Sequence, residues 1–366
     1  MKTSQTISAL PLTLAALLAI LAVPFLFGCT PLPSFSQVPP VEVTPESADL
    51  PVEHTAIEVW FTDPDNSRPG EEPVEVVLSS IDSAQHSIDL SIYNLTNIRV
   101  AQALLQARGN GVQVRIVMES DNLEREVPRR LLAARIPIRG DEQGSLMHNK
   151  FMVVDGEVLL TGSANFTENG LGSDNNYLLR MEDPLLAKIY LDEFNSMYEG
   201  GRFGSEDLQP TGMNQFDIDG SAVEVLFSPE DQVEEKLLAL TSEADSNIHF
   251  LAYTFTLDGL GQSLLDKHAA GVDVRGVFEG EMLPGSTGTE YDRFRRAGMD
   301  IRLDGNPNLM HEKLMVIDGE IVVIGSYNFT RAADERNDEN VMIIYDPQLA
   351  ALFETEFRNI FEKGKP

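Results

Sequence analysis

The sequence contains few cysteine, histidine and basic residues. Cys29 is the only cysteine among 366 residues, so no disulfide bond can form within the chain. The six histidines show no pairing of imidazoles, and no clustering with carboxylates, at the spacing of metal ligands. We therefore expect neither a metal ion nor another cofactor.

Basic residues number 27 against 58 acidic ones, which gives a formal net charge of −31 at pH 7 with histidine neutral. A charge of that sign repels polyanions and argues against broad binding along a nucleic-acid backbone, although a small basic site inside an acidic shell stays compatible with it. A saline habitat would explain the same composition. The length and the 42% hydrophobic content suit two globular domains.

One long uncharged run lies near the start of the chain. Lys2 is followed by no charged residue from Thr3 to Cys29, and this pattern predicts an export signal at 1–28. The sequence LFGC that ends at Cys29 resembles a bacterial lipobox, whose cysteine is lipidated and becomes the new N-terminus. An uncleaved transmembrane anchor is the alternative. Either way we expect an extracytoplasmic, membrane-anchored protein of the cell envelope.

The segment at 29–55 is rich in proline and polar residues and predicts an extended linker that holds a globular part away from the lipid surface.

Two stretches further along read almost alike: MHNKFMVVDGEVLLTGSANFT at 147–167 and MHEKLMVIDGEIVVIGSYNFT at 310–330. Other segments return in the same order: IEVWF as VEVLF, SIDLSIYNLT as NIHFLAYTFT, and GVQVRIVME as GVDVRGVFE. The duplication covers nearly all of the chain beyond the first linker. We predict two similar repeats, 56–200 and 222–366, joined by a Gly-rich and polar linker at 201–221.

Each repeat alternates between helix-like and strand-like segments. In the first repeat, PVEVVLSSIDSAQHS and NIRVAQALLQARGNG read as helices, and the second of them ends in glycine as helices often do. IDLSIYN and VQVRIVME read as strands. This alternation predicts an α/β fold.

Asp155-Gly156 and Asp318-Gly319 each stand between two apolar runs, which predicts a two-residue hairpin turn in each repeat. The turn and its local hydrogen bonds explain both aspartates without a catalytic role.

Counting outward from the first turn pairs Lys150 with Thr161 and His148 with Ser163. Because alternate residues of a strand share a face, Ser163 and Asn165 should lie beside His148 and Lys150 at the open end of the hairpin.

The same count in the second repeat places His311 opposite Ser326, with Lys313 and Asn328 nearby. Lysine supplies a cation, and serine and asparagine supply neutral donors, a combination that suits phosphate oxygens. Histidine adds a nucleophile, acid or base near neutral pH. A solvated strand end explains a lone histidine or lysine, but it does not explain two histidines in identical frames among six.

The segments HNKFMVVD and HEKLMVID, followed by GSAN and GSYN, resemble the HKD signature of the phospholipase D superfamily over both repeats. The resemblance implies two similar phospholipase D-like α/β repeats with mixed sheets flanked by helices, whose motifs meet at a pseudo-twofold interface to build one active site. It also implies the roles of the motif residues. His148 would attack phosphorus to give a phosphohistidine, and His311 would act as acid and then as base. The non-bridging oxygens would be bound by Lys150, Lys313, Asn165 and Asn328, with Ser163 and Ser326 in support.

Members of this superfamily also carry an acidic residue beyond each motif that orients an imidazole. Glu339, 28 residues after His311, fits that place. The corresponding residue in the first repeat is Asn176, with Asp174 two residues before it, and an asparagine cannot stabilise an imidazolium as a carboxylate does. The two histidines are therefore not expected to be equivalent.

The resemblance implies a phosphodiesterase, and the substrate has three interpretations. The net charge and the expected membrane anchor favour hydrolysis of the headgroup-side phosphodiester of phospholipids. The ending GS-x-N-F-T resembles the nuclease and cardiolipin-hydrolase branch, so a metal-independent endonuclease acting on DNA or RNA is the alternative. A scaffold that binds phosphates without turnover is the third, and the intact motifs argue against it. We expect the protein to be a monomer.

Overall fold

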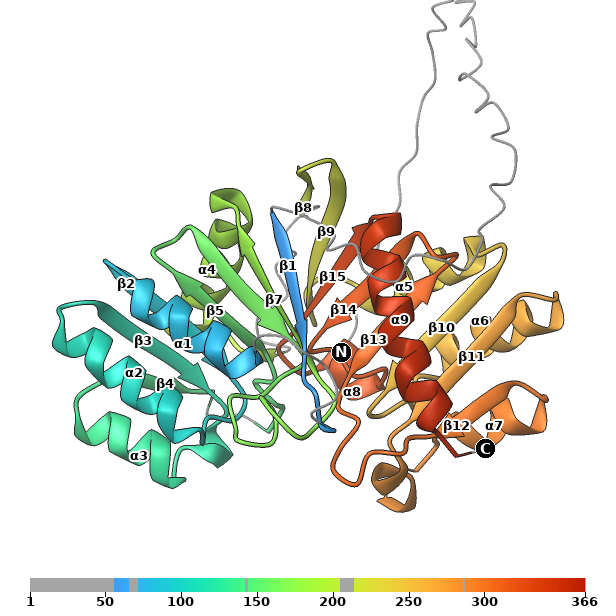
Figure 1. Cartoon of the computed structure of the whole chain (residues 1–366), viewed down its shortest axis with the longest axis horizontal. Helices are drawn as coiled ribbons and strands as arrows, with labels where there is room; N and C mark the ends of the chain where they lie inside the picture. Colours follow the sequence, from blue (N-terminus) through green and yellow to red (C-terminus); the bar gives the residue numbers. More distant parts are fainter. Residues whose placement is uncertain (1–55, 66–71, 142–143, 205–213, 286, 366) are drawn as a thin grey trace, which may run out of the picture. The chain divides into compact units, whose positions relative to one another are not determined.

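Two mixed β-sheets, one in each sequence repeat, organise the protein (Figure 1). All described residues belong to the compact unit Val52–Pro366. The computed structural model describes residues 56–65, 72–141, 144–204, 214–285 and 287–365.

The predicted signal peptide at 1–28, the predicted linker at 29–55 and the expected lipidation site, Cys29, lie outside the described residues. Within the described ranges, no helix combines the length and the apolar character needed to cross a bilayer.

The two sheets have the same strand order. The first runs β1-β7-β6-β5-β2-β3-β4, and the second, from β9 to β12, runs β9-β15-β14-β13-β10-β11-β12, with β8 added at the edge beside β9. The first sheet comprises β1 (Ile57–Phe61), β2 (Ser87–Ile92), β3 (Gln113–Met118), β4 (Ile138–Gly140), β5 (Lys150–Val154), β6 (Val158–Gly162) and β7 (Tyr177–Glu182). The second comprises β8 (Asn214–Ile218), β9 (Ser221–Ser228), β10 (Asn247–Ala252), β11 (Asp273–Phe278), β12 (Asp300–Leu303), β13 (Lys313–Ile317), β14 (Ile321–Gly325) and β15 (Glu339–Tyr345).

In both sheets the three strands at one end are parallel, and the other pairs are antiparallel. The predicted α/β class, the internal duplication and the mixed sheets are therefore confirmed. The predicted linker at 201–221 is wrong in its second part, because 214–218 form the edge strand β8, which pairs with β9 through a tight turn.

Helices begin where the sequence supplies a cap. The Asn97 side chain accepts hydrogen bonds from two N–H groups of the first turn of α2, and Asp183 and Asp346 cap α4 and α9, each followed by a proline. The first repeat holds α1 (Pro73–Ser83), α2 (Ile98–Gly109), α3 (Glu126–Ala133) and α4 (Pro184–Tyr198). The second holds α5 (Val233–Glu243), α6 (Asp258–Ala269), α7 (Tyr291–Arg296), α8 (Arg331–Glu335) and α9 (Pro347–Lys363).

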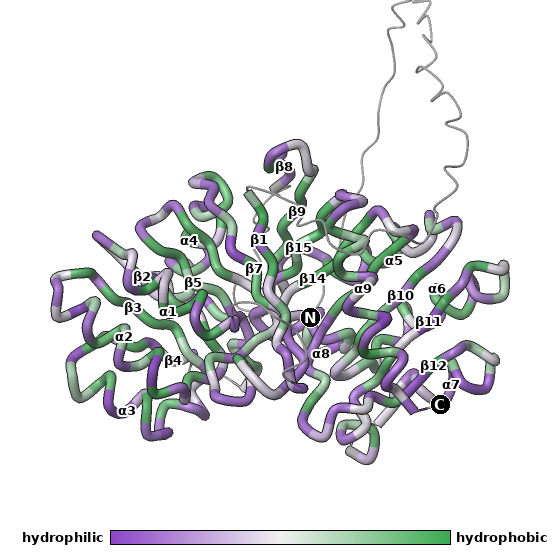
Figure 2. The backbone as a smooth tube through the Cα atoms, viewed as in Figure 1, coloured by the Kyte–Doolittle hydropathy of each residue, from purple (hydrophilic) through white to green (hydrophobic). Residues whose placement is uncertain are grey.

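Each sheet packs one face against helices of its own repeat, α1 to α3 on the first and α5 to α7 on the second. The opposite faces, with α4 and α9, contribute to a core that both repeats share, and Figure 2 shows the apolar character of the central strands. In this core Tyr190 lies edge-on between Phe151 and Phe227, with ring centroids 5.0 and 5.2 Å apart. Since truncating a buried phenylalanine costs about 3–5 kcal/mol, such contacts hold the repeats together.

The Asp-Gly turns form as predicted. Asp155 and Gly156 have φ angles of 54° and 69°, the left-handed conformation that these residue types supply in a hairpin turn. However, the strands pair Val154 with Val158, so Glu157 is an extra residue on the returning strand, as in a β-bulge.

This extra residue shifts the hairpin register by one position. The predicted pairing of Lys150 with Thr161 is wrong, because Thr161 pairs with Phe151. The prediction that His148 lies opposite Ser163 rests on the same count and fails with it. The second hairpin shows the same shift.

The turn aspartates anchor the hairpins to the segments before β2 and β10. The carboxylate of Asp155 accepts hydrogen bonds from the N–H groups of Gln85, His86 and Ser87 at 2.7–2.8 Å. Asp318 binds the N–H groups of residues 245–247 in the same way. Their hydrogen bonds are thus long-range, where the sequence predicted local ones, but they are structural contacts as expected.

Candidate active site

Backbone hydrogen bonds attach each hairpin to the opposite repeat, at the segment that precedes β15 or β7. The His148 N–H donates to the carbonyl oxygen of Asp338 at 2.9 Å, and the His311 N–H donates to the carbonyl oxygen of Asn175 at 3.0 Å. Each motif histidine is therefore positioned by the main chain of the opposite repeat.

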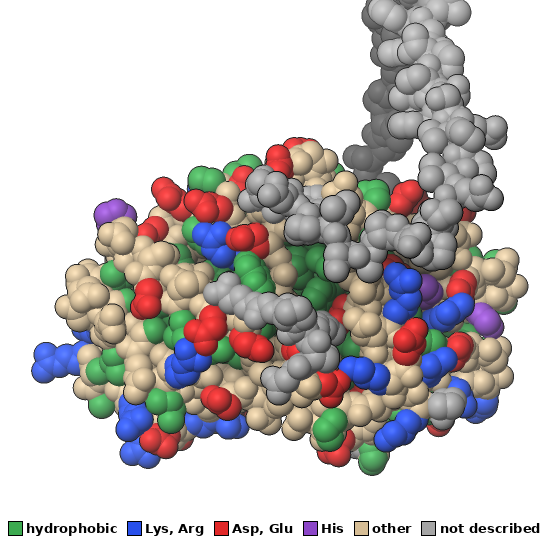
Figure 3. Space-filling model, in the orientation of Figure 1, with side chains coloured by type: hydrophobic (Ala, Val, Ile, Leu, Met, Phe, Trp, Pro, Cys, Tyr) green, Lys and Arg blue, Asp and Glu red, His purple; other side chains and the backbone are tan. Residues whose placement is uncertain are grey.

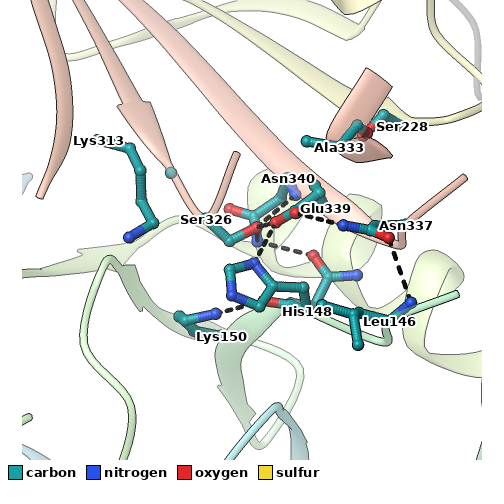
Figure 4. A network of polar contacts seen from close by, with 12 residues as sticks. Leu146, His148, Lys150, Ser228, Lys313, Ser326, Ala333, Asn337, Glu339 and Asn340 are labelled. Carbon is teal, nitrogen blue, oxygen red and sulfur yellow. Dashed lines mark hydrogen bonds and ion pairs between the residues drawn. The ribbon is translucent and has the colours of Figure 1, made fainter. Parts of the chain in front are cut away.

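His148 is paired with a carboxylate from the second repeat. Its Nδ1 lies 2.7 Å from Oε2 of Glu339, whose side chain is fully buried (Figure 4). The same Oε2 accepts a hydrogen bond from the Ser326 hydroxyl at 2.6 Å. Glu339 thus fixes the ring and makes Nδ1 the protonated nitrogen, which leaves Nε2 as the reactive one.

His311 is paired with neutral acceptors from the first repeat. Its Nδ1 lies 3.1 Å from the carbonyl oxygen of Ser163 and 3.1 Å from Oδ1 of Asn176. The Ser163 hydroxyl donates to the same Oδ1 at 2.8 Å, and the Asn176 amide donates to the carbonyl of Gly170. The tautomer is the same as in the other half, but among the described residues no carboxylate is in hydrogen-bond contact with this ring.

The groups that support the imidazoles therefore cross the interface. Placing Ser163 beside His148 and Ser326 beside His311 was wrong, because each serine belongs to the hydrogen-bond network of the other histidine. The hairpin register alone cannot reveal this, since the crossing depends on how the repeats dock.

Lys150 and Lys313 lie behind the histidines, each only 2% exposed. Their Nζ atoms donate to the carbonyl oxygens of His148 and His311 at 2.6 Å. Burial lowers the pKa of Lys150 to about 7 and lowers that of Lys313 well below its usual value. Burial therefore disfavours the protonated form of both lysines as long as no anion is bound nearby.

Two tyrosines complete this arrangement, and the sequence analysis missed them. The Tyr93 ring meets His148 edge-on at 5.0 Å, and the Tyr253 ring meets His311 at 4.6 Å. The lysine Nζ atoms lie 5.4 Å and 4.7 Å from the same two ring centroids. The sequence does repeat them, because Tyr93 directly follows β2 and Tyr253 directly follows the equivalent strand β10. However, an aromatic residue at a strand end usually indicates core packing.

Both imidazoles are held neutral. Burial lowers the pKa of His148 to about 4, against the opposing effect of Glu339. Burial, together with the charges of Lys313 and Lys150, lowers the pKa of His311 well below its usual value. Burial alone would raise the pKa of Glu339, but its histidine and lysine neighbours hold it below its usual value. The site thus combines an ionised glutamate with two neutral rings.

The histidines open onto a cleft of about 670 Å³ that both repeats line. Asn165 and Asn328 reach it from equivalent positions, and both buried Oδ1 atoms lack a hydrogen-bond partner among the described residues. The site residues expected from the sequence thus divide into two layers. His148, His311, Asn165 and Asn328 line the cleft, and Lys150, Lys313, Ser163, Ser326 and Glu339 stand behind them.

Within the described ranges, no group of three or more His, Cys, Asp or Glu side chains is arranged to hold a metal ion. Asp155 and Asp318 do not line the cleft.

Several known proteins are similar in sequence. The mitochondrial cardiolipin hydrolase of Chlamydomonas reinhardtii is 32% identical over 130 residues, which cover 36% of this chain and 58% of the hydrolase. The phospholipase D of Rickettsia conorii is 30% identical over 159 residues, 43% of this chain and 79% of the enzyme. The chain thus spans about three-fifths of the first relative's length.

Among solved structures, the phosphatidylserine synthase of Haemophilus influenzae superposes with a TM-score of 0.66, covering 86% of this chain and 88% of the synthase at 14% identity. That likeness concerns the fold, and it extends over both repeats. The family model described as "Cardiolipin synthase, PLD-like domain" matches residues 77–198 and again 237–361, one match in each repeat. With both repeats matched and both motif histidines on one cleft, the chain belongs to this phospholipase D-like family.

Proposed function

We propose that the protein is a phosphodiesterase that hydrolyses the headgroup-side phosphodiester of phospholipids through a phosphohistidine intermediate, without a metal ion. The observation that carries the proposal is the shared cleft, where His148 and His311 come from different repeats and each has its Nδ1 bound by the opposite repeat. Displacement at a diester needs a nucleophile and a separately placed acid. The cleft offers one imidazole for each.

In the first step, Nε2 of His148 attacks phosphorus and the bond from phosphorus to the leaving alcohol breaks. Glu339, at 2.7 Å from Nδ1, stabilises the positive charge that the ring gains. The departing oxygen takes a proton from Nε2 of His311. Because His311 is neutral in the free protein, binding of the anionic diester must raise its pKa, and the ring takes up that proton from solvent.

In the second step, water attacks the phosphohistidine. His311, now neutral, accepts a proton from the water as the bond between phosphorus and His148 breaks. One diester and one water thus give a phosphomonoester and an alcohol. His148 is neutral again, and His311 returns to its initial neutral state when it releases its proton to solvent as the product leaves.

The groups around the rings stabilise the phosphate. The carboxamide N–H groups of Asn165 and Asn328 are donors for the non-bridging oxygens. Lys150 and Lys313, buried behind the rings, gain a counter-charge when the phosphate binds, so their protonated forms become favoured.

Two considerations support a phospholipid as the substrate. The similar proteins are named cardiolipin hydrolase and phospholipase D. In addition, the chain carries a net charge of −31, and on the coloured part of the face in Figure 3 the basic side chains are interspersed with acidic ones. Neither the net charge nor this mixed surface favours a protein that binds along a nucleic-acid backbone.

The test uses purified full-length protein and vesicles of phosphatidylcholine or phosphatidylethanolamine with EDTA present. We expect release of free headgroup together with phosphatidic acid, and formation of phosphatidylethanol when ethanol competes with water. Loss of activity on chelation, restored by a divalent ion, would overturn the metal-free mechanism. Ready cleavage of single-stranded DNA or RNA with the lipids untouched would establish the endonuclease alternative.

We also propose that a lipid on Cys29 anchors the protein to a membrane of the cell envelope, as the LFGC sequence after an uncharged run indicates. Mass spectrometry of the mature N-terminus should find a diacylglyceryl-modified cysteine. An intact N-terminus, or cleavage elsewhere with a soluble product, would contradict the anchor. We expect the protein to be a monomer, which light scattering in detergent can test.

A further inference from the structure

The two walls of the cleft differ in charge, although the repeats supply them from equivalent places. The first repeat contributes the charged residues Arg125, Glu168 and Asp174, whereas the second contributes only uncharged ones, such as Thr254, Met282 and Thr330. Among the described residues that line the cleft, Arg125 is the only lysine or arginine. The wall from the first repeat therefore carries one cation and two carboxylates, whereas the described residues of the other wall include no lysine, arginine or carboxylate.

Arg125 is held in place on the side of His148. Its Nε donates to Oδ1 of Asn122 at 2.7 Å, and the buried amide of Asn122 donates to the carbonyl oxygen of Tyr93 at 2.7 Å. Tyr93 is the residue whose ring contacts His148. This chain of contacts fixes the guanidinium relative to the reacting ring, and its two terminal nitrogens make no hydrogen bond or ion pair with a described residue.

The second repeat has no equivalent of this arrangement. Counting from the matching strands β3 and β11, both repeats form a 3₁₀ helix here, Ser120–Asn122 and Gly280–Gly285. However, Met282 takes the place of Asn122, and Gly285 takes the place of Arg125. Both carboxylates of the first wall have partners: Glu168 accepts a hydrogen bond from the Asn97 amide at 3.1 Å, and Asp174 accepts one from the Leu309 N–H at 3.3 Å. Arg125 is thus the cleft-lining cation with unused donors.

We propose that Arg125 is a specificity-determining residue that binds a second anionic group of the substrate, a phosphate or a carboxylate, on the His148 side of the cleft. The planar fork of an arginine matches such a group with two parallel hydrogen bonds. The inference rests on the proposed function and names its substrate class: phosphodiester lipids that carry a second anionic group near the scissile phosphate.

A binding experiment tests the inference without requiring turnover. Isothermal titration calorimetry compares glycerol 1,3-bisphosphate with glycerol 1-phosphate on the wild-type protein and on Arg125→Gln. A charge-assisted pair corresponds to about 10- to 100-fold in affinity, so the wild type should prefer the bisphosphate by that factor and the variant should lose the preference. A preference that survives in Arg125→Gln would overturn the inference.

Kinetics separates this role from a structural one. In phosphatidylcholine vesicles, Arg125→Gln should raise KM at least about tenfold for cardiolipin, which has two phosphates, and much less for phosphatidylglycerol, which has one. The small diester bis(p-nitrophenyl) phosphate should be hydrolysed at the wild-type rate. Arg129→Gln is the matched control, because this arginine is exposed on α3, directly after Arg125, and does not line the cleft.

The remaining outcomes are also decisive. Equal losses on all three substrates would overturn the specificity role and leave the proposed function standing. An effect of Arg125→Gln on a trinucleotide but not on cardiolipin would overturn the lipid as the source of the second anion. If wild-type protein hydrolyses none of the substrates, the proposed function fails, and the calorimetry alone decides whether Arg125 reads a second anion.

Discussion

The two halves of the site start from nearly identical hairpins and give their histidines different partners. His148 has the carboxylate of Glu339 at Nδ1, and His311 has the amide oxygen of Asn176 and a backbone carbonyl. The first repeat does have a carboxylate two residues before Asn176, at Asp174. Its side chain lines the cleft and accepts a hydrogen bond from the Leu309 N–H.

That difference shows how a duplicated motif can divide two tasks. A ring that becomes covalently phosphorylated gains positive charge, which a buried carboxylate stabilises. A ring that must lose and regain a proton at Nε2 within one cycle is better served by a neutral acceptor at Nδ1. A carboxylate there would raise the pKa of the ring and make the proton at Nε2 harder to release. Pairing His148 with Glu339 and His311 with Asn176 meets both requirements.

The largest expected effect comes from removing either imidazole. His148→Asn and His311→Asn should each lose on the order of 10²–10⁴-fold in kcat or more. The double variant should be hardly worse than the single ones, because the residues act as a unit. Initial rates on phospholipid vesicles measure this, with His86→Asn as the matched control at an exposed position outside the cleft. Two half-activities would mean that the halves work independently.

The same variants sharpen the comparison when the leaving group needs no acid. With a p-nitrophenyl diester, His311→Asn should recover part of its activity and His148→Asn should not. Radioactive phosphate trapped from a labelled diester should then appear on His148. Label on His311 in the wild-type protein would reverse the two roles.

The next largest effect is expected for Glu339→Gln. The substitution keeps a hydrogen-bond acceptor near Nδ1 but removes the charge that balances the phosphorylated ring, so kcat should fall about 10²-fold. Asn176→Gln is the matched control, since it lengthens the amide on the other side without altering charge. If kcat falls equally in the two variants, the carboxylate has no special role.

A smaller effect, on pH dependence, is expected for Asn176→Asp. In the wild type, kcat/KM for a phospholipid should rise as the pH increases through about 4, because His148 must be neutral to attack. It should fall as the pH increases through the pKa of His311, which lies well below 6.5, because that ring must be protonated. The optimum is therefore acidic. A carboxylate at position 176 raises the His311 pKa, so the falling limb should move about one unit or more to higher pH. An unmoved limb would contradict His311 as the acid.

The smallest effect on activity is expected at the turn aspartates. Asp155→Ala and Asp318→Ala each leave backbone N–H groups without their acceptor, so each should lower the free energy of unfolding by about 1–3 kcal/mol. Urea denaturation measures this loss. The kcat per folded molecule should stay unchanged, and a selective loss of kcat would assign these residues a part in the chemistry.

The fold and the two motif histidines could be predicted from the sequence because they depend on local patterns. The Asp-Gly turns, the alternation of strands and helices, and the repetition of His148 as His311 are all properties of short segments. The hairpin register was missed because a bulge residue such as Glu157 has no distinctive side chain.

The rest depends on how the two repeats dock. Nothing in the neighbourhood of Ser163 or Ser326 indicates that each serves the imidazole of the other repeat. Tyr93 resembles an ordinary strand aromatic until its ring is seen beside His148. Arg125 lies more than twenty residues from the motif, and the corresponding segment of the second repeat, Gly280–Gly285, contains no arginine, so the repetition that revealed the rest of the site could not reveal it.

The crossed backbone contacts, from His148 to Asp338 and from His311 to Asn175, constrain how the duplicated gene can diverge. A substitution near one motif therefore alters the contacts of the histidine in the other repeat. Residues that are distant in the sequence must consequently change together. Gene conversion that copied the first half over the second would replace Glu339 with asparagine and remove the only carboxylate in hydrogen-bond contact with a motif imidazole in the described structure. Selection is thereby expected to act against homogenisation of the two copies and to preserve the inequality between them.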